Sequence, residues 1–183
     1  MHMMINGGIM KKLLIVVDYQ NDFVDGALGF EGANKLDEVI ANKIKDYKKN
    51  NYDVIFTFDT HNEDYMQTEE GNNLPVKHCI KGTIGHELYG EVKNCFDKDV
   101  DVYFEKPTFP SLELANYLKE KEYEEIELCG LVSNICVLSN VVMVKSALPN
   151  AKIIVDSKAT DSFDKKLNEY TLEILKGIHV KVL

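Results

Sequence analysis

The chain has 183 residues, 45% of them hydrophobic and 28% charged, a composition typical of one globular domain with a sizeable core. Its formal net charge of −9 argues against nucleic-acid binding through phosphates, and no apolar run is long enough to predict a membrane span. Because no signal peptide is recognisable, we expect a cytoplasmic protein in which the four cysteines are reduced thiols.

Strand and helix patterns alternate along the chain. Residues 1–10 are small and polar, and we expect them to lie outside the fold as a disordered or added start, with residues 11–183 forming a single domain. Short apolar runs predict strands at 13–17, 54–58, 102–105, 126–131, 153–155 and 179–183. Between them, helical spacing predicts helices at 36–47, after the capping residue Ser111, at 134–148 and at 167–175. The irregular segment 59–85 is too long for a simple connection, which favours a functional loop.

The alternation predicts the fold class. Six strands separated by helices favour parallel pairing with right-handed crossovers, and therefore a three-layer α/β/α fold. We expect the strand order 3-2-1-4-5-6. Ligands of such sheets bind beyond the carboxyl ends of the strands, where the strand order reverses, so a functional site should be built from residues that follow strands.

Three reactive side chains follow predicted strands. Cys136 comes after the fourth strand at a predicted helix start, where the helix dipole would lower the pKa of the thiol; the alternative is a buried apolar cysteine. Asp18 ends the first strand and Lys106 the third, although alone they could be a turn cap and a solvated lysine. Together they supply a base, a charge partner and a nucleophile.

A second group follows the second strand. Asp59 and His61 are two residues apart, so their side chains leave an extended segment on the same side. With His78 or a loop carboxylate they could bind a divalent metal such as zinc, the alternative being a satisfied turn. Cys79 is disfavoured as a ligand beside His78, because adjacent residues of an extended segment point in opposite directions.

These motifs together resemble the isochorismatase-like cysteine hydrolases and, within them, the nicotinamidase/pyrazinamidase family. The matching segments occur in the family's order and extend over nearly the whole chain from the first strand: 16–23, 58–61, 75–83, 105–109 and 130–137. The resemblance implies the same six-stranded parallel sheet and a catalytic triad of Asp18, Lys106 and Cys136.

The resemblance also implies the surroundings of the thiol. A cis peptide bond is expected at Val132–Ser133, with backbone N–H groups of Ser133 and Cys136 turned toward an oxyanion. On family spacing, Phe23 and Phe109 are expected to pack against the ring of the substrate.

The family's metal site would consist of Asp59, His61 and His78, with Glu70 or its neighbour Glu69 as an additional carboxylate. One divalent ion is implied, zinc first, while iron and manganese suit the same ligands. Relatives that act on isochorismate lack this set, so its retention favours an amidase acting on a pyridine carboxamide.

The implied activity is hydrolysis of nicotinamide, and also of pyrazinamide, through a cysteine thioester in NAD salvage, by a homo-oligomer. The alternatives are another amide or ureido hydrolase of the superfamily, an isochorismate vinyl-ether hydrolase, or a non-catalytic α/β binding module. Two departures bear on the substrate: the chain has no Trp, so Asn73 or Leu74 stands where the family often has an aromatic residue, and residues 133–135 differ from the usual family sequence.

Overall fold

The computed structural model describes residues 10–183, so the expected start lies outside the described residues except for Met10. The sheet has the order β3-β2-β1-β4-β5-β6, and every neighbouring pair is parallel. This confirms the predicted topology. The strands are β1 (Lys12–Val17), β2 (Asp53–Asp59), β3 (Val102–Lys106), β4 (Glu125–Leu131), β5 (Lys152–Asp161) and β6 (Lys181–Val182).

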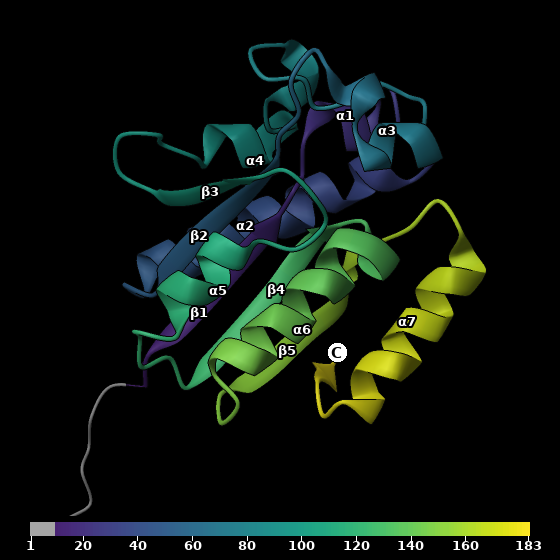
Figure 1. Cartoon of the computed structure of the whole chain (residues 1–183). Coiled ribbons are helices and arrows are strands. Elements are labelled where there is room, and N and C mark those ends of the chain that lie inside the picture. The colour runs from purple at the N-terminus through teal and green to yellow at the C-terminus, as the bar shows by residue number, and fades with distance from the viewer. Residues whose placement is uncertain (1–9) are drawn as a thin grey trace, which may run out of the picture.

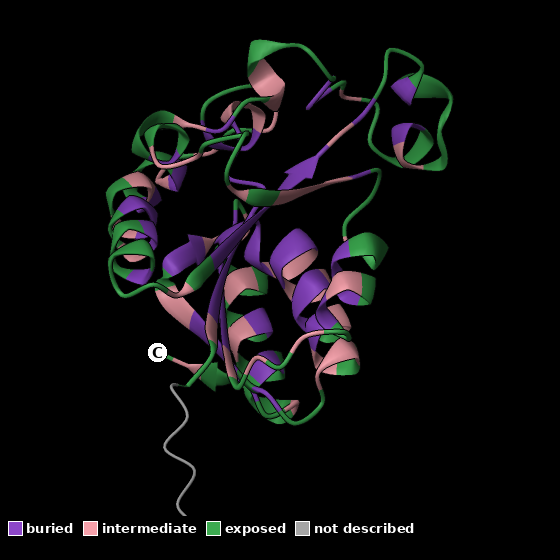
Figure 2. Ribbon diagram, turned by 90° about the vertical axis from the view of Figure 1, so that its left-hand side faces the viewer, coloured by how far each residue is buried: buried purple, intermediate pink, exposed green. Residues whose placement is uncertain are grey.

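Helices cover both faces of the sheet, and short helices lie above its carboxyl edge (Figures 1 and 2). One face is covered by α2 (Asp37–Lys49) and α4 (Gly90–Asn94), and the other by α5 (Leu112–Leu118), α6 (Leu138–Ala147) and α7 (Lys165–Gly177). At the carboxyl edge lie α1 (Asn21–Val24) and α3 (Glu69–Asn73). In residues 10–183, none of the helices has the length and apolar character needed to cross a membrane.

The central strand β1 shows why the apolar runs form the middle layer. Leu14 and Val16 belong to the core under α2, whereas Leu13, Ile15 and Val17 belong to the core under α5 and α6. All five side chains have no exposed surface. A strand buried on both faces needs apolar residues at every position, which is the pattern that predicted it.

Three elements differ from their predicted bounds. β5 extends to Asp161 and becomes buried again at Ala159. Its end was predicted too early because the polar residues 156–158 interrupt the apolar run. The last strand is only two residues long. The helix predicted at 134–148 begins instead with a π turn, Ser133–Val137, and becomes α-helical at Leu138.

The carboxyl ends of β1 and β4 approach each other closely. Gly130 has φ +112°, and a Cβ atom at this position would collide with the Val17 carbonyl oxygen of the neighbouring strand. Only glycine fits such an approach. Asp18, which follows β1, therefore lies beside the turn that leaves β4.

Candidate active site

Three buried side chains meet at the carboxyl edge of the sheet. Lys106 Nζ lies 2.5 Å from Asp18 Oδ2 and 3.7 Å from Cys136 Sγ. Asp18 has no exposed surface, Lys106 is 1% exposed and Cys136 is 4% exposed. The structure thus brings together the carboxylate, the ammonium and the thiol that were selected from three separate strand ends.

Local contacts hold the side chains of Asp18 and Lys106 in place. Asp18 has a left-handed backbone conformation, with φ +46°, and the Thr57 hydroxyl donates a 2.7 Å hydrogen bond to Asp18 Oδ1. Lys106 is the last residue of β3, and its ammonium also donates to the Thr108 carbonyl oxygen at 3.0 Å. Both side chains therefore have a fixed position before any ligand binds.

Burial and charge oppose each other in the Asp18–Lys106 pair. Burial raises the pKa of Asp18, and the charge of Lys106 counteracts this only partly. Burial would lower the pKa of Lys106, but the neighbouring Asp18 and Cys136 outweigh it and raise that pKa. Lys106 therefore remains an ammonium, beside a carboxylate that is a stronger base than an exposed aspartate.

The thiol of Cys136 differs from the sequence expectation. Burial raises its pKa well above the usual value, and the charge of Lys106 does not compensate. Cys136 is the fourth residue of the π turn and lies next to the Asp18 carboxylate, which also raises the pKa, so the lowered pKa expected at a helix start is not found. At rest the side chain is a protonated thiol that needs a base.

Asn140 fixes the position of the thiol and was missed from the sequence. Its Nδ2 donates to the carbonyl oxygens of Cys136, at 2.8 Å, and Phe109, at 3.1 Å. Its Oδ1 accepts the N–H of Ser111 at 3.0 Å. Asn140 is fully buried, and a polar residue one helical turn after Cys136 was the available signal.

The predicted metal ligands also converge. One ligand atom each from Asp59, His61, Glu70 and His78 lies within 4.8 Å of the others. His61 Nε2 is 3.0 Å from Asp59 Oδ2, and His78 Nε2 is 3.3 Å from the same oxygen. The second oxygen of Glu70 is buried without a hydrogen-bond partner. Two imidazole nitrogens and two carboxylates, one of them incompletely satisfied, fit a divalent metal.

Backbone pairing brings the two histidines together. The N–H of His61 donates to the Cys79 carbonyl at 3.0 Å, and the N–H of Lys81 donates to the His61 carbonyl at 2.9 Å. His78, next in the chain to Cys79, has its Nδ1 2.8 Å from the Val76 carbonyl oxygen. That contact leaves Nε2 free to face the cluster.

The structure distinguishes between the two glutamates at the start of α3. Thr68 caps this helix by accepting the Gly71 N–H. Glu70 faces the cluster, whereas Glu69 is exposed and accepts a hydrogen bond from Asn73 Nδ2 at 2.8 Å. Glu70 is therefore the loop carboxylate of the cluster.

The two groups of side chains form one site. Lys106 Nζ lies 3.5 Å from Asp59 Oδ1 as well as beside Asp18. Gln20 bonds both backbone groups of Asp59: its Nε2 donates to the carbonyl at 2.9 Å and its Oε1 accepts the N–H at 2.8 Å. Asp59 is thus fixed through its backbone while its carboxylate faces both Lys106 and the histidines.

A cavity of about 510 Å³ opens onto this site. Phe23 and Phe109, predicted to contact the substrate, both line it. Phe163 was missed although it follows the carboxyl end of β5, where the rule on strand ends would have placed it. The other lining residues are Ala27, Leu28, Gly29, Asp59, Glu70, Leu74, His78, Val132, Ile135 and Cys136.

The turn after β4 corrects one prediction. The cis peptide bond lies at Leu131–Val132, one residue before the expected Val132–Ser133, because the chain turns directly after the last residue of the strand. The Val132 carbonyl accepts the N–H groups of Ile135 and Val137, each at 3.2 Å. The Ser133 hydroxyl donates to Asn168 Oδ1 on α7 at 2.5 Å. That Ser133 and Cys136 hold an oxyanion stays a prediction.

The α/β sheet, the group of Asp18, Lys106 and Cys136, and the adjoining cluster of metal-ligand candidates together define a class, the isochorismatase-like hydrolases. The isochorismatase domain model matches residues 12–183, and the chain belongs to this family.

Two comparisons with proteins of Bacillus subtilis agree with this assignment. An isochorismatase family protein named PncA, described as uncharacterized, from strain 168 is 33% identical over 173 residues, which cover 89% of this chain and 93% of that protein. A crystal structure of the B. subtilis nicotinamidase/pyrazinamidase PncA has a TM-score of 0.85 at 30% identity, covering 94% of this chain and 99% of that chain.

A third comparison concerns the fold alone. The pyrazinamidase of Pyrococcus horikoshii in complex with zinc has a TM-score of 0.82 at 23% identity, covering 94% of this chain and 98% of that one.

Proposed function

We propose that the protein is a nicotinamidase that hydrolyses nicotinamide to nicotinic acid and ammonia and also accepts pyrazinamide. One observation carries the proposal: a single cavity is lined both by Cys136 and by the metal-ligand candidates Asp59, Glu70 and His78. A pyridine carboxamide has two matching groups, a ring nitrogen for a metal and a carboxamide carbon for a thiol. The relative crystallised as a nicotinamidase/pyrazinamidase supports the same substrate class.

The first half of the reaction forms a thioester. Asp18 takes the proton of Cys136, whose raised pKa keeps it protonated at rest. Lys106 stabilises the thiolate, which attacks the carboxamide carbon. Backbone N–H groups of Ser133 and Cys136 hold the oxyanion, and one such donor is typically worth about 10²–10³ in rate. Asp18 then gives the proton to the departing ammonia.

The second half restores the thiol. Asp18 takes a proton from the water that attacks the thioester carbon, and returns it to the sulfur of Cys136 as the acid leaves. Phe23 and Phe109 hold the ring in a partly apolar cavity and limit the access of other water molecules. The product, nicotinic acid, would enter NAD salvage.

Four residues of the chain would hold the metal: Asp59, His61, Glu70 and His78. A divalent ion bound there would supply a Lewis acid that coordinates the ring nitrogen of the substrate. We propose zinc, as in the P. horikoshii pyrazinamidase complex, and the same ligands suit iron and manganese.

A substrate panel tests the proposed specificity. Ammonia release should be fast with nicotinamide and pyrazinamide and much slower with benzamide, which has the same shape without a ring nitrogen. Equal rates with benzamide would contradict docking of the ring on the metal. Faster turnover of an N-carbamoyl compound would support the ureido hydrolase alternative, and no release from any amide would support the non-catalytic module.

A further inference from the structure

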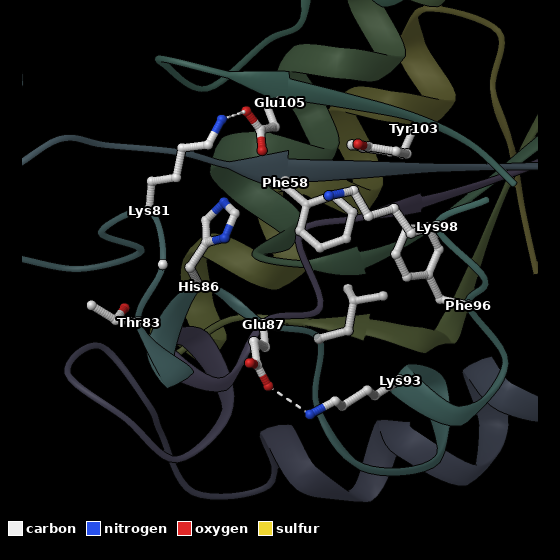
Figure 3. A pocket seen from close by; sticks show the side chains of 12 residues that line it. Phe58, Lys81, Thr83, His86, Glu87, Lys93, Phe96, Lys98, Tyr103 and Glu105 are labelled. Carbon is white, nitrogen blue, oxygen red and sulfur yellow. Dashed lines mark hydrogen bonds and ion pairs between the residues drawn. The ribbon is translucent and has the colours of Figure 1, made fainter.

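A second cavity, of about 440 Å³, shares no lining residue with the catalytic cavity. It lies between the ends of β2 and β3 and the segment 81–98 (Figure 3). Its volume is within the range of small-molecule pockets. Neither the proposed reaction nor the family resemblance assigns a role to it.

Aromatic rings form the walls of this cavity. The ring centroid of Phe58 lies 5.4 Å from that of Phe96 and 5.8 Å from that of Tyr103. The centroids of Phe96 and Tyr103 are 5.6 Å apart, and the His86 ring lies 5.7 Å from Phe58. Such ring edges and faces favour a planar aromatic guest, which can make the same offset and edge-to-face contacts.

The charged side chains that line the cavity are three lysines and two glutamates, while Asp97 and Asp99 flank Lys98 in the chain but do not line the cavity. Lys81 pairs with Glu105 and Lys93 with Glu87, each at 2.5 Å, so these four charges compensate one another (Figure 3). Lys98 also lines the cavity, and among residues 10–183 it belongs to no ion pair. Its exposed ammonium would attract an anionic group and repel a cation, although aromatic walls alone would accept a cation as well.

We propose that this cavity is a binding site for a planar aromatic molecule with one anionic group, a carboxylate or a phosphate. The ring of the guest packs against the cluster of Phe58, Phe96 and Tyr103, and the anion pairs with Lys98. The proposal does not depend on the proposed nicotinamidase activity, because the two cavities share no residue.

The test is an NMR titration of the uniformly ¹⁵N-labelled full chain with benzoate and, separately, phenyl phosphate. The amide signals of Gly82, Thr83 and Lys98 report on the second cavity, and those of Val132 and Cys136 report on the catalytic one. Either probe should shift the first group of signals with a saturable concentration dependence. The tighter probe identifies the preferred anion.

Two variants and one further probe separate a specific site from general charge attraction. Lys98→Glu should weaken binding at the second cavity about tenfold or more, because an attraction is replaced by a repulsion. Lys119→Glu makes the same change of charge at an exposed position beside α5, on the other face of the sheet, and should leave binding unchanged. Acetate, an anion without a ring, should cause no saturable shift.

The proposal is overturned if benzoate and phenyl phosphate shift only the signals around Cys136. It is also overturned if acetate binds as tightly as benzoate, or if Lys98→Glu binds benzoate as tightly as Lys119→Glu.

Discussion

At the scale of single residues, Lys106 joins the two halves of the site. Its ammonium is 2.5 Å from Asp18 Oδ2 and 3.5 Å from Asp59 Oδ1, with 1% of the residue exposed. Lys106→Ala would leave two buried carboxylates without this partner, which typically costs about 3–5 kcal/mol. We expect it to abolish activity and to lower the free energy of unfolding by about that amount in urea denaturation.

Cys136→Ala is the matched control for this prediction. It should also abolish activity but cost only about 1 kcal/mol in stability, because it removes a sulfur atom and no charge. Equal stabilities of the two variants would show that Lys106 does not compensate the buried carboxylates.

Asn140 gives a second prediction at this scale. Asn140→Ala removes hydrogen bonds to the backbone of Cys136, Phe109 and Ser111. Each buried group left without a partner costs about 1–3 kcal/mol. A displaced thiol should lower kcat for nicotinamide on the order of 10–100-fold. Ser111→Ala, which keeps the Asn140 contacts and loses only a helix cap, should leave kcat nearly unchanged, and the same loss in both variants would contradict the positioning role.

At the scale of elements, the segment between β2 and β3 decides the metal site. The sequence predicts that this segment is irregular and functional. Only the short helix α3 determines that Glu70 faces the metal-ligand cluster while the adjacent Glu69 is exposed. Glu70→Gln should weaken zinc binding by at least about 10–100-fold in competition with a chromophoric chelator. Glu69→Gln makes the same change of charge one residue away and should bind zinc like the wild type; equal losses would place the ligand elsewhere.

The comparison of predicted and observed elements shows which parts of the fold and of the site could be predicted from the sequence. The apolar run of β1 and the residues at or directly after the ends of β1, β2 and β3 follow from local patterns, so the topology and the positions of Asp18, Asp59 and Lys106 were predictable. The raised pKa of Cys136 was not, because it depends on burial by distant segments. Phe163 and Asn140 were missed because β5 was predicted too short and because Asn140 acts through backbone groups that only the tertiary structure brings near.

At the scale of the whole molecule, the metal ligands connect β2 to α3 and to the segment before Ile80. A metal that binds only the folded chain stabilises it by about 2.7 kcal/mol at a concentration 100 times the Kd. For a chain of this length, that corresponds to a rise in Tm of about 5–11 °C. We expect zinc to produce this rise in differential scanning calorimetry of the chelator-treated protein.

The quadruple change of Asp59, His61, Glu70 and His78 to Ala, if it folds, should show no zinc-dependent rise. A chelator-treated wild type whose Tm is insensitive to zinc would contradict the metal site. The homo-oligomer and the cytoplasmic location stay predictions, and light scattering after size exclusion measures the former.

The central claim is that Cys136 forms a thioester during amide hydrolysis. The most direct measurement is mass spectrometry of the intact protein quenched in acid during turnover of nicotinamide, with ammonia release followed in parallel. We predict a nicotinoyl adduct on Cys136 in the wild type, and neither adduct nor ammonia with Cys136→Ala. Ammonia release by Cys136→Ala at the wild-type rate would contradict the account.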